Sequence, residues 1–347
     1  MSRIEENALL PPSDLNEPSP PVNDGDIATE LRAIRHGAAI HYVSDWHWLT
    51  LRGRDHIDFL QRMCTNAVDS RDLGEHVELV FADARGRIIE RADLCRVTEE
   101  STLLVLGPGE PHTLPEWLDR YIFSEDIEFC LPATGETMIE LLGPEAHRFL
   151  EGIPCHDGTT SDDLGLMIAR LTWAGVDTVR LVGAETEISR VWKRLVHDGA
   201  IPVGEAAWNV HRIESGIPLR GAELTDAHNP WEARLSGAVD LNKGCYIGQE
   251  VIARLEAYDK VKQSLVGLLL PDGASENDRL LHDGKDVGYV CSAAQHPEQR
   301  RIGLGYVRNA HAHPKTELEI DGRQGMCQIV DLPMHQSMPD TKVYSTS

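Results

Sequence analysis

The chain has 347 residues, of which 41% are hydrophobic, enough to bury more than one core. Its 56 acidic and 33 basic side chains give a formal net charge of −23, and a surface of this charge repels the phosphates of nucleic acids. No uncharged apolar run is long enough to span a bilayer, and the N-terminus lacks the features of a secretory signal. We therefore expect a cytoplasmic protein with neither nucleic acid nor membrane as a direct partner.

The first part of the chain predicts a disordered tail followed by the start of a folded region. Residues 1–26 are rich in proline and acidic residues and show almost no apolar periodicity. From Ile27 a short helix is expected to lead into strands, in which the tryptophans Trp46 and Trp48 are interpreted as packing residues. A second helix follows, with Ile57, Leu60 and Met63 on one face and Asp55 as its N-cap.

The middle of the chain predicts strands combined with helices. Residues 77–97 read as a hairpin around the turn Asp83-Ala84-Arg85-Gly86. The segments 134–152 and 177–199 each predict a strand, a turn that contains glycine and an amphipathic helix, an arrangement of ferredoxin-like style. We therefore predict an α+β region over residues 27–261 that is built from two such modules.

The pattern changes near residue 262 to short alternating segments separated by turn residues. This spacing favours a C-terminal β-barrel over residues 262–335, followed by a tail over 336–347. The predicted fold class is therefore α+β, with two modules and a separate barrel.

The cysteines direct attention to one loop. The seven cysteines are scattered and include no C-x-x-C pair, so we expect neither a disulfide framework nor a zinc knuckle. Most of them are expected to be small buried hydrophobic residues. Cys245 differs, because it lies in the stretch K-G-C-Y-I-G-Q-E over residues 243–250, immediately before a predicted helix.

The residues around Cys245 favour a reactive thiol. Gly244 and Gly248 permit tight bends, and the next residues have helical spacing. A helix N-terminus and the neighbouring Lys243 would both lower the pKa of a thiol. Such a cysteine suits a nucleophile, a redox thiol or a soft metal ligand. The alternative is a cysteine that only fills a turn, beside a solvated lysine.

The segment 211–254 contains three ordered elements that resemble the folate-binding YgfZ proteins, which are relatives of the glycine-cleavage T-protein (aminomethyltransferase). The elements are R-x-E-x-G-x-P (Arg212, Glu214, Gly216, Pro218), P-x-E-A (Pro230, Glu232, Ala233) and K-G-C-Y-x-G-Q-E (Lys243 to Glu250). The likeness extends over about residues 45 to 335, and includes a T-N element at Thr65-Asn66.

This resemblance implies a folate-binding α+β region with a C-terminal barrel, and tetrahydrofolate as the cofactor. The residues that it implies for folate binding are Asn66, Arg212, Glu214, Glu232, Tyr246, Gly248 and Gln249, and those for chemistry are Cys245, Lys243 and Glu90. Two of these have open alternatives. Glu232 reads equally as a ligand of a pterin edge or of a backbone amide, and Arg212 reads as a folate clamp or as the partner of Glu214 or Asp240.

Two departures from the T-protein pattern bear on the function. The aspartate that the T-protein places after the hairpin turn is replaced by Glu90, with Arg91 after it, and Glu90 also reads as a solvated strand residue. The T-G-E-D-G element, whose glutamate contacts the pterin, is replaced by T-W-A-G-V-D-T-V-R over residues 172–180.

The resemblance therefore favours the accessory branch, which uses tetrahydrofolate and supports assembly or repair of iron–sulfur enzymes, including some that modify tRNA. Its expected partners are a reduced folate and iron–sulfur client or assembly proteins. The alternative is a folate-dependent aminomethyltransferase of the T-protein type.

Overall fold

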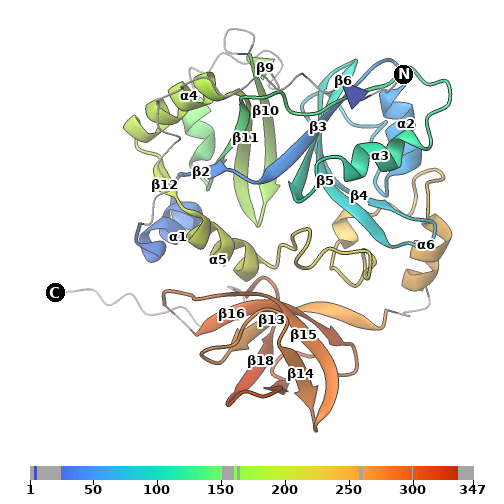
Figure 1. Cartoon of the computed structure of the whole chain (residues 1–347). Coiled ribbons are helices and arrows are strands. Elements are labelled where there is room, and N and C mark those ends of the chain that lie inside the picture. Colours follow the sequence, from blue (N-terminus) through green and yellow to red (C-terminus); the bar gives the residue numbers. More distant parts are fainter. Residues whose placement is uncertain are drawn as a thin grey trace. The chain divides into compact units, whose positions relative to one another are not determined.

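The computed structural model describes residues 4–5, 25–150, 160–161, 165–257, 261–298 and 300–334 (Figure 1). Most of the tail predicted over 1–26, and all of that predicted over 336–347, lie outside these residues. The chain divides into two compact units. The first comprises Met1–Trp208 and Leu219–Val261, and the second comprises Asn209–Pro218 and Lys262–Ser347. Within the described part of the chain, no helix combines the length and the apolar character needed to cross a membrane.

The first unit contains two six-stranded sheets. The strands of one sheet lie in the order β1-β7-β3-β6-β5-β4. Their bounds are Ile4–Glu5 (β1), Trp46–Arg52 (β3), His76–Ala82 (β4), Ile88–Thr98 (β5), Ser101–Pro108 (β6) and Glu128–Cys130 (β7). The helices α2 (His56–Met63) and α3 (Thr113–Asp119) cover one face of this sheet.

The helix α2 forms where the apolar spacing predicts it, although its buried face differs from the prediction. The buried residues are His56, Phe59, Leu60 and Met63, whereas Ile57 is only partly buried. Asp55 holds the N-cap position, but its carboxylate accepts the N–H of Asp126 at 2.7 Å and makes no side-chain bond to the helix. The carboxylate that was expected to cap α2 is therefore hydrogen-bonded to the loop before β7.

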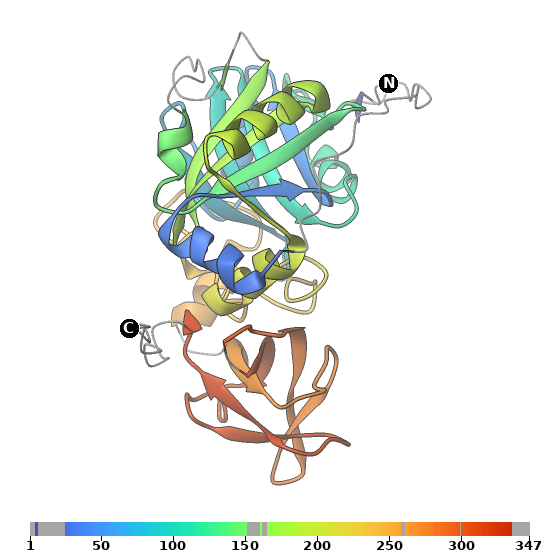
Figure 2. The same ribbon diagram turned by 90° about the vertical axis from the view of Figure 1, so that its left-hand side faces the viewer.

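The strands of the second sheet lie in the order β12-β2-β8-β11-β10-β9. Their bounds are Ala39–Val43 (β2), Glu136–Leu142 (β8), Thr160–Ser161 (β9), Leu166–Trp173 (β10), Val176–Ala184 (β11) and Ile201–Val203 (β12). The helices α1 (Ile27–His36) and α4 (Glu185–His197) lie beside this sheet (Figure 2). The helix α5 (Glu205–Ser215) begins in the first unit and continues into the second.

One predicted helix of this sheet is wrong. Segment 134–152 gives the strand β8, but Ala146–Leu150 forms a 3₁₀ turn (η1) in place of an amphipathic α-helix. Its backbone bonds, from the N–H of Ala146 to Gly143 and from that of Arg148 to Glu145, have the shorter 3₁₀ spacing. Segment 177–199 behaves as predicted, because β11 leads directly into α4.

The predicted hairpin is confirmed. The strands β4 and β5 pair antiparallel, with an irregularity between Phe81 and Ala82. The turn is closed by the N–H of Gly86, which donates to the carbonyl of Asp83 at 2.8 Å, and the Asp83 carboxylate accepts the backbone N–H groups of Arg85 and Arg87. A positive φ of 71° at Gly86 explains the glycine there.

The second unit contains a closed six-stranded barrel with the order β13-β16-β15-β14-β17-β18. Its strands are Gln263–Leu270 (β13), Arg279–His282 (β14), Lys285–Ala294 (β15), Arg301–Arg308 (β16), Glu317–Ile320 (β17) and Met326–Val330 (β18). Between α5 and the barrel, the chain of the first unit forms a 3₁₀ turn, Ser236–Ala238 (η2), and the helix α6 (Gln249–Ala257). The predicted α+β fold with a C-terminal barrel is confirmed.

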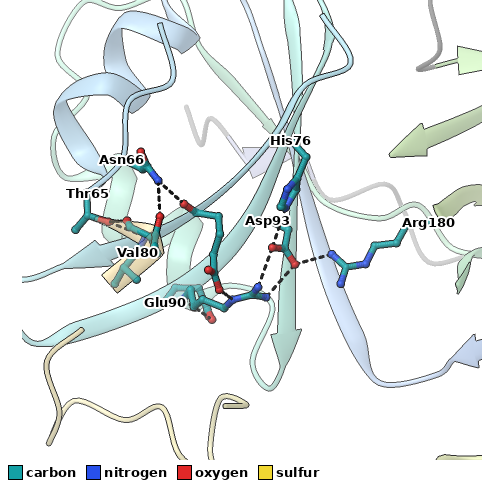
Figure 3. A network of polar contacts seen from close by, with 11 residues as sticks. Thr65, Asn66, His76, Val80, Glu90, Asp93 and Arg180 are labelled. Atoms are coloured by element: carbon teal, nitrogen blue, oxygen red, sulfur yellow. Dashed lines mark hydrogen bonds and ion pairs between the residues drawn. The ribbon is translucent and has the colours of Figure 1, made fainter. Parts of the chain in front are cut away.

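A buried ionic network joins the two sheets of the first unit (Figure 3). Arg180 of β11 contacts Asp93 of β5 at 2.6 Å and Glu140 of β8 at 2.7 Å, and all three side chains are buried. Arg91 and His76 also bond to Asp93, at 2.8 and 3.0 Å. Burial opposes the charge on Asp93, but the two guanidinium groups and His76 keep its pKa well below its ordinary value.

Aromatic rings enclose this network. The indoles of Trp173 and Trp208 stack with their centroids 5.0 Å apart, and Trp46 meets both edge-on. The guanidinium of Arg180 lies 5.1 Å from the centroid of Trp46. Burial would lower the pKa of His41, which stacks on Trp208, but Glu140 and Glu205 outweigh it and raise that pKa to about 9. Trp46 and Trp48 are both buried, as the sequence predicts.

We expect Arg180→Met to be strongly destabilising, because it leaves the buried carboxylate of Glu140 facing Asp93 without the cation that lies between them. Loss of one partner of a buried ion pair costs about 3–5 kcal/mol. The free energy of unfolding in urea measures this. The control is Arg190→Ala, which removes an exposed pair with Glu187 and should cost less than about 1 kcal/mol. Equal losses in the two variants would contradict a network that holds the sheets together.

Candidate functional site

The loop 243–250 lies against the turn of the β4–β5 hairpin. A Cβ atom on Gly248 would come within 2.4 Å of the carbonyl oxygen of Asp83, and the φ of Gly248 is +84°. Both facts require glycine at this position. Beyond it, Val251 and Ile252 of α6 approach Gly86 of the turn. Gly248 is thus a packing position, which allows the loop and the hairpin turn to meet backbone to backbone.

Lys243 anchors this loop to the connection between α2 and β4. Its Nζ donates to the carbonyl oxygens of Cys64 at 2.8 Å and Asn66 at 2.7 Å, and lies 3.9 Å from the sulfur of Cys64. Burial lowers the pKa of Lys243, and the nearby Cys64 and acidic residues oppose this effect. Lys243 is half-buried, so the reading of a solvated lysine is wrong. The ammonium group of Lys243 therefore contacts Cys64, a cysteine for which the sequence predicted no special role.

The side chains of Thr65 and Asn66 form hydrogen bonds to the backbone of neighbouring segments. The hydroxyl of Thr65 donates to the carbonyl of Ala238 at 2.6 Å. The amide nitrogen of Asn66 donates to the carbonyls of Glu78 and Gly237 (Figure 3), and its oxygen accepts the N–H of Ala67. The structure therefore gives Asn66, predicted to bind folate, a role in fixing η2 to β4.

Cys245 is exposed at the surface of the first unit, whereas the other described cysteines are buried or half-buried. The helix α6 begins at Gln249, and the oxygen of the Gln249 side chain accepts the N–H of Tyr246 at 3.0 Å. Tyr246 is buried, with its ring 5.4 Å from Nζ of Lys243. Burial raises the pKa of Tyr246 to about 12. The half-buried Lys243 and the buried Tyr246 flank the segment that displays Cys245.

Glu90 is buried beside a cation that the sequence did not identify. Its carboxylate contacts Nη1 of Arg220 at 2.8 Å and accepts the N–H of Arg91 at 3.2 Å. Burial raises the pKa of Glu90 to about 7, although Arg220 opposes the shift. The reading of Glu90 as a solvated strand residue is therefore wrong. Successive side chains of a strand point to opposite faces, so Arg91 turns instead toward Glu78 and Asp93.

Glu232 lies near the hairpin as well. Its carboxylate accepts the backbone N–H of Asn229 at 3.2 Å and lies 3.5 Å from Nη1 of Arg87. Contact with a backbone amide, one of the two readings that the sequence left open, is present, and contact with a pterin edge stays a prediction. The side chain of Asn229 in turn accepts the N–H groups of Trp231 and Glu232, which closes this turn tightly.

Arg212 and Glu214 belong to the second unit and are buried there. The guanidinium of Arg212 donates to the side chain of Asn209 and to the hydroxyl of Ser292, both at 2.8 Å, and to the carbonyl of Ile217 at 3.3 Å. These bonds fix the plane of the guanidinium against β15. The sequence did not signal Ser292, because it lies 80 residues further along the chain.

The predicted site residues thus fall into separate groups. Lys243, Tyr246, Gly248 and Gln249 lie with Cys245 in one loop, which Lys243 joins to Asn66, whereas Glu90 pairs with Arg220. Arg212 and Glu214 lie in the other unit. No group of three or more side chains suited to a metal ion occurs among the described residues.

We expect Lys243→Met to destabilise the first unit, because two carbonyl oxygens lose their charged donor. Leaving buried polar groups without a partner costs about 1–3 kcal/mol. The exposed Lys285 is the matched control, and Lys285→Met should change the free energy of unfolding by no more than about 0.5 kcal/mol. If both variants unfold at the same urea concentration as the parent chain, the anchoring role of Lys243 is refuted.

Comparison with known proteins agrees with this fold. The GCVT N-terminal domain matches residues 18–243, and the glycine cleavage T-protein C-terminal barrel domain matches residues 263–335. A chloroplastic protein of Arabidopsis thaliana whose name assigns it to the transferases is 30% identical over 81% of this chain and 68% of its own length. An aminomethyltransferase of Symbiobacterium thermophilum is 26% identical over 91% of both chains.

A solved structure extends the likeness to three dimensions. The glycine cleavage system aminomethyltransferase T of Bartonella henselae superposes with a TM-score of 0.77 over 89% of both chains, at 22% sequence identity. At this identity the superposition establishes a common fold.

Proposed function

We propose that this chain, which belongs to the glycine cleavage T-protein family, is a tetrahydrofolate-binding accessory protein of the YgfZ type that supports assembly or repair of iron–sulfur enzymes. Its partners would be a reduced folate and iron–sulfur client or assembly proteins, among them enzymes that modify tRNA. The observation that carries the proposal is the loop 243–250, whose lysine is anchored and whose cysteine is exposed.

The anchored loop favours a role for Cys245 outside the core of the protein. Lys243 and Tyr246 bury their side chains on either side of it, so the position of the thiol is defined although the thiol itself is exposed. Thiolates are the usual protein ligands of iron–sulfur clusters. A single thiol on a defined loop supplies one ligand or one nucleophile, and a client protein would have to supply the remaining ligands of a cluster.

The segment that departs from the T-protein pattern supports an accessory role over an aminomethyltransferase. Trp173 and Arg180 of residues 172–180 are both buried. Arg180 makes ion pairs with Asp93 and Glu140, so its charge is already balanced within the protein. A buried cation of this kind holds the two sheets together. The glutamate that the T-protein pattern uses to contact the pterin is absent from this segment.

Calorimetry with a reduced folate tests the ligand. We expect saturable heat on titration with 5-formyltetrahydrofolate, and no release of ammonia or methylene-tetrahydrofolate from an aminomethyl-lipoyl donor. Absence of binding at millimolar folate would refute the folate proposal. Turnover of the donor would instead favour the alternative function, an aminomethyltransferase.

Cys245→Ala tests the thiol. In a cell that lacks the protein, we expect this variant to fail to restore iron–sulfur enzyme activity while it still binds folate and unfolds like the parent chain, because the side chain is exposed. In the folded protein, Cys245 should also be the cysteine that alkylates fastest, since the others described are less exposed. Cys130→Ala, at a half-buried position, is the control and should restore activity. Full restoration by Cys245→Ala would remove the thiol from the proposed function.

A further inference from the structure

Cys64 and Lys243 bring a thiol and an amine into contact inside the first unit. Cys64 is the C-cap residue of α2 and is fully buried. The Nζ atom of Lys243, which lies 179 residues further along the chain, is 3.9 Å from its sulfur. Both groups are nucleophiles, so they form no bond with each other as they stand. Oxidation turns the sulfur into an electrophile, and the amine then lies beside it.

The backbone holds these two reactive atoms together. The sulfur of Cys64 donates to the carbonyl oxygen of Asn66 at 3.3 Å, and Nζ of Lys243 donates to the same oxygen at 2.7 Å. A lysine side chain has a flexible four-carbon stem, so Nζ can close the remaining distance to the sulfur once it leaves the carbonyls. Groups held in contact in this way react far more readily than the same groups free in solution.

Burial and charge set the reactivity of both groups. Burial raises the pKa of Cys64, which slows its oxidation, but the charge of Lys243 opposes this shift. For Cys95, burial alone raises the pKa to about 11. Burial also lowers the pKa of Lys243, which enlarges the fraction of neutral, nucleophilic amine. Lys243 is only half-buried, so a small uncharged oxidant can reach the contact from solvent. We therefore expect slow oxidation of Cys64, and slower oxidation of Cys95.

We propose that this contact is a modification site, at which hydrogen peroxide produces a sulfenamide bond between the sulfur of Cys64 and Nζ of Lys243. Peroxide oxidises the Cys64 thiol to a sulfenic acid and is itself reduced to water. The neutral amine of Lys243 then attacks the sulfur, and the hydroxyl group leaves with a proton of the amine as a second water. The sulfur loses two electrons in total and the peroxide gains them. Excess thiol reverses the bond by attack on the sulfur.

The bond would release the loop 243–250 from its anchor. Once joined to sulfur, Nζ of Lys243 is no longer an ammonium group and gives up its bonds to the carbonyls of Cys64 and Asn66. The segment that displays Cys245 would therefore shift. Peroxide also attacks iron–sulfur clusters, so the bond would form under the condition that damages the expected clients. This consequence rests on the proposed function, whereas the bond itself does not.

The experiment is peptide mapping of the folded full-length chain after treatment with hydrogen peroxide, alkylation of the remaining thiols and digestion with trypsin. We expect the peptide 63–71 joined to the peptide 235–254, with Lys243 uncleaved and a mass that is lower by two hydrogens than the sum of the two. A disulfide between Cys64 and Cys245 would leave Lys243 open to trypsin, so cleavage there separates the two products. Dithiothreitol before alkylation should restore the separate peptides.

Two variants and a control identify the atoms involved. Lys243→Arg keeps a cation but removes the amine, and Cys64→Ser removes the sulfur with little change in size, so both should lose the joined peptides. Cys95→Ala, at another buried cysteine of the first unit, should yield them to the same extent as the parent chain. A parent chain in which trypsin still cleaves fully at Lys243 while Cys64 is oxidised or unchanged would overturn the proposal. Because neither folate nor a client enters this measurement, that result leaves the proposed function intact.

Discussion

The ion pairs of Arg180 with Asp93 (Figure 3) and with Glu140 are the interaction on which the first unit depends, because they join its two sheets through charges that are buried away from water. A buried ion pair gains stability only when its geometry is good and its remaining hydrogen-bonding groups are satisfied. Here each carboxylate has a second partner: Arg91 for Asp93, and the indole N–H of Trp208 for Glu140. The sheets are therefore held in one relative position, since a shift of either would leave several charges unpaired.

The residues predicted to carry the function lie outside this ionic network, on the hairpin and the loop that packs against it. The hairpin turn at Gly86 and the loop at Gly248 are in contact through their backbones. The position of the loop 243–250 is therefore fixed by its packing against the β4–β5 hairpin. The strand β5 also contributes Ile88 to the lining of a cavity beside Arg220, and Glu90 as the ion-pair partner of Arg220. One strand thus contributes Asp93 and Arg91 to the core, and Glu90 to a site near its end.

The parts of this structure that the sequence predicted are those encoded by neighbouring residues. The hairpin follows from alternation around Asp83-Ala84-Arg85-Gly86, and the barrel follows from short strands between turns. Contacts between distant residues were not predictable. The carbonyl that Lys243 reaches on Cys64 is 179 residues away, and the burial of Glu90 depends on Arg220. The helix expected after β8 failed for the same reason. Local spacing favoured it, but the backbone N–H groups of Gly143 and Glu145 donate to the carbonyls of the distant residues Asp177 and Gly37.

The ammonium group of Lys243 is bonded to other parts of the chain, and this limits what it can contribute to any chemistry of the Cys245 thiol. Two carbonyl oxygens hold the ammonium at 2.7 and 2.8 Å, so its charge is directed at the connection between α2 and β4. A cation fixed in this way cannot also move to a substrate on Cys245 without breaking both bonds, and in a half-buried setting that loss is large. The lysine of the motif is therefore a positioning residue for the loop. Any reactivity of Cys245 would therefore come from its exposure and from the backbone of its own loop, and not from the charge of Lys243.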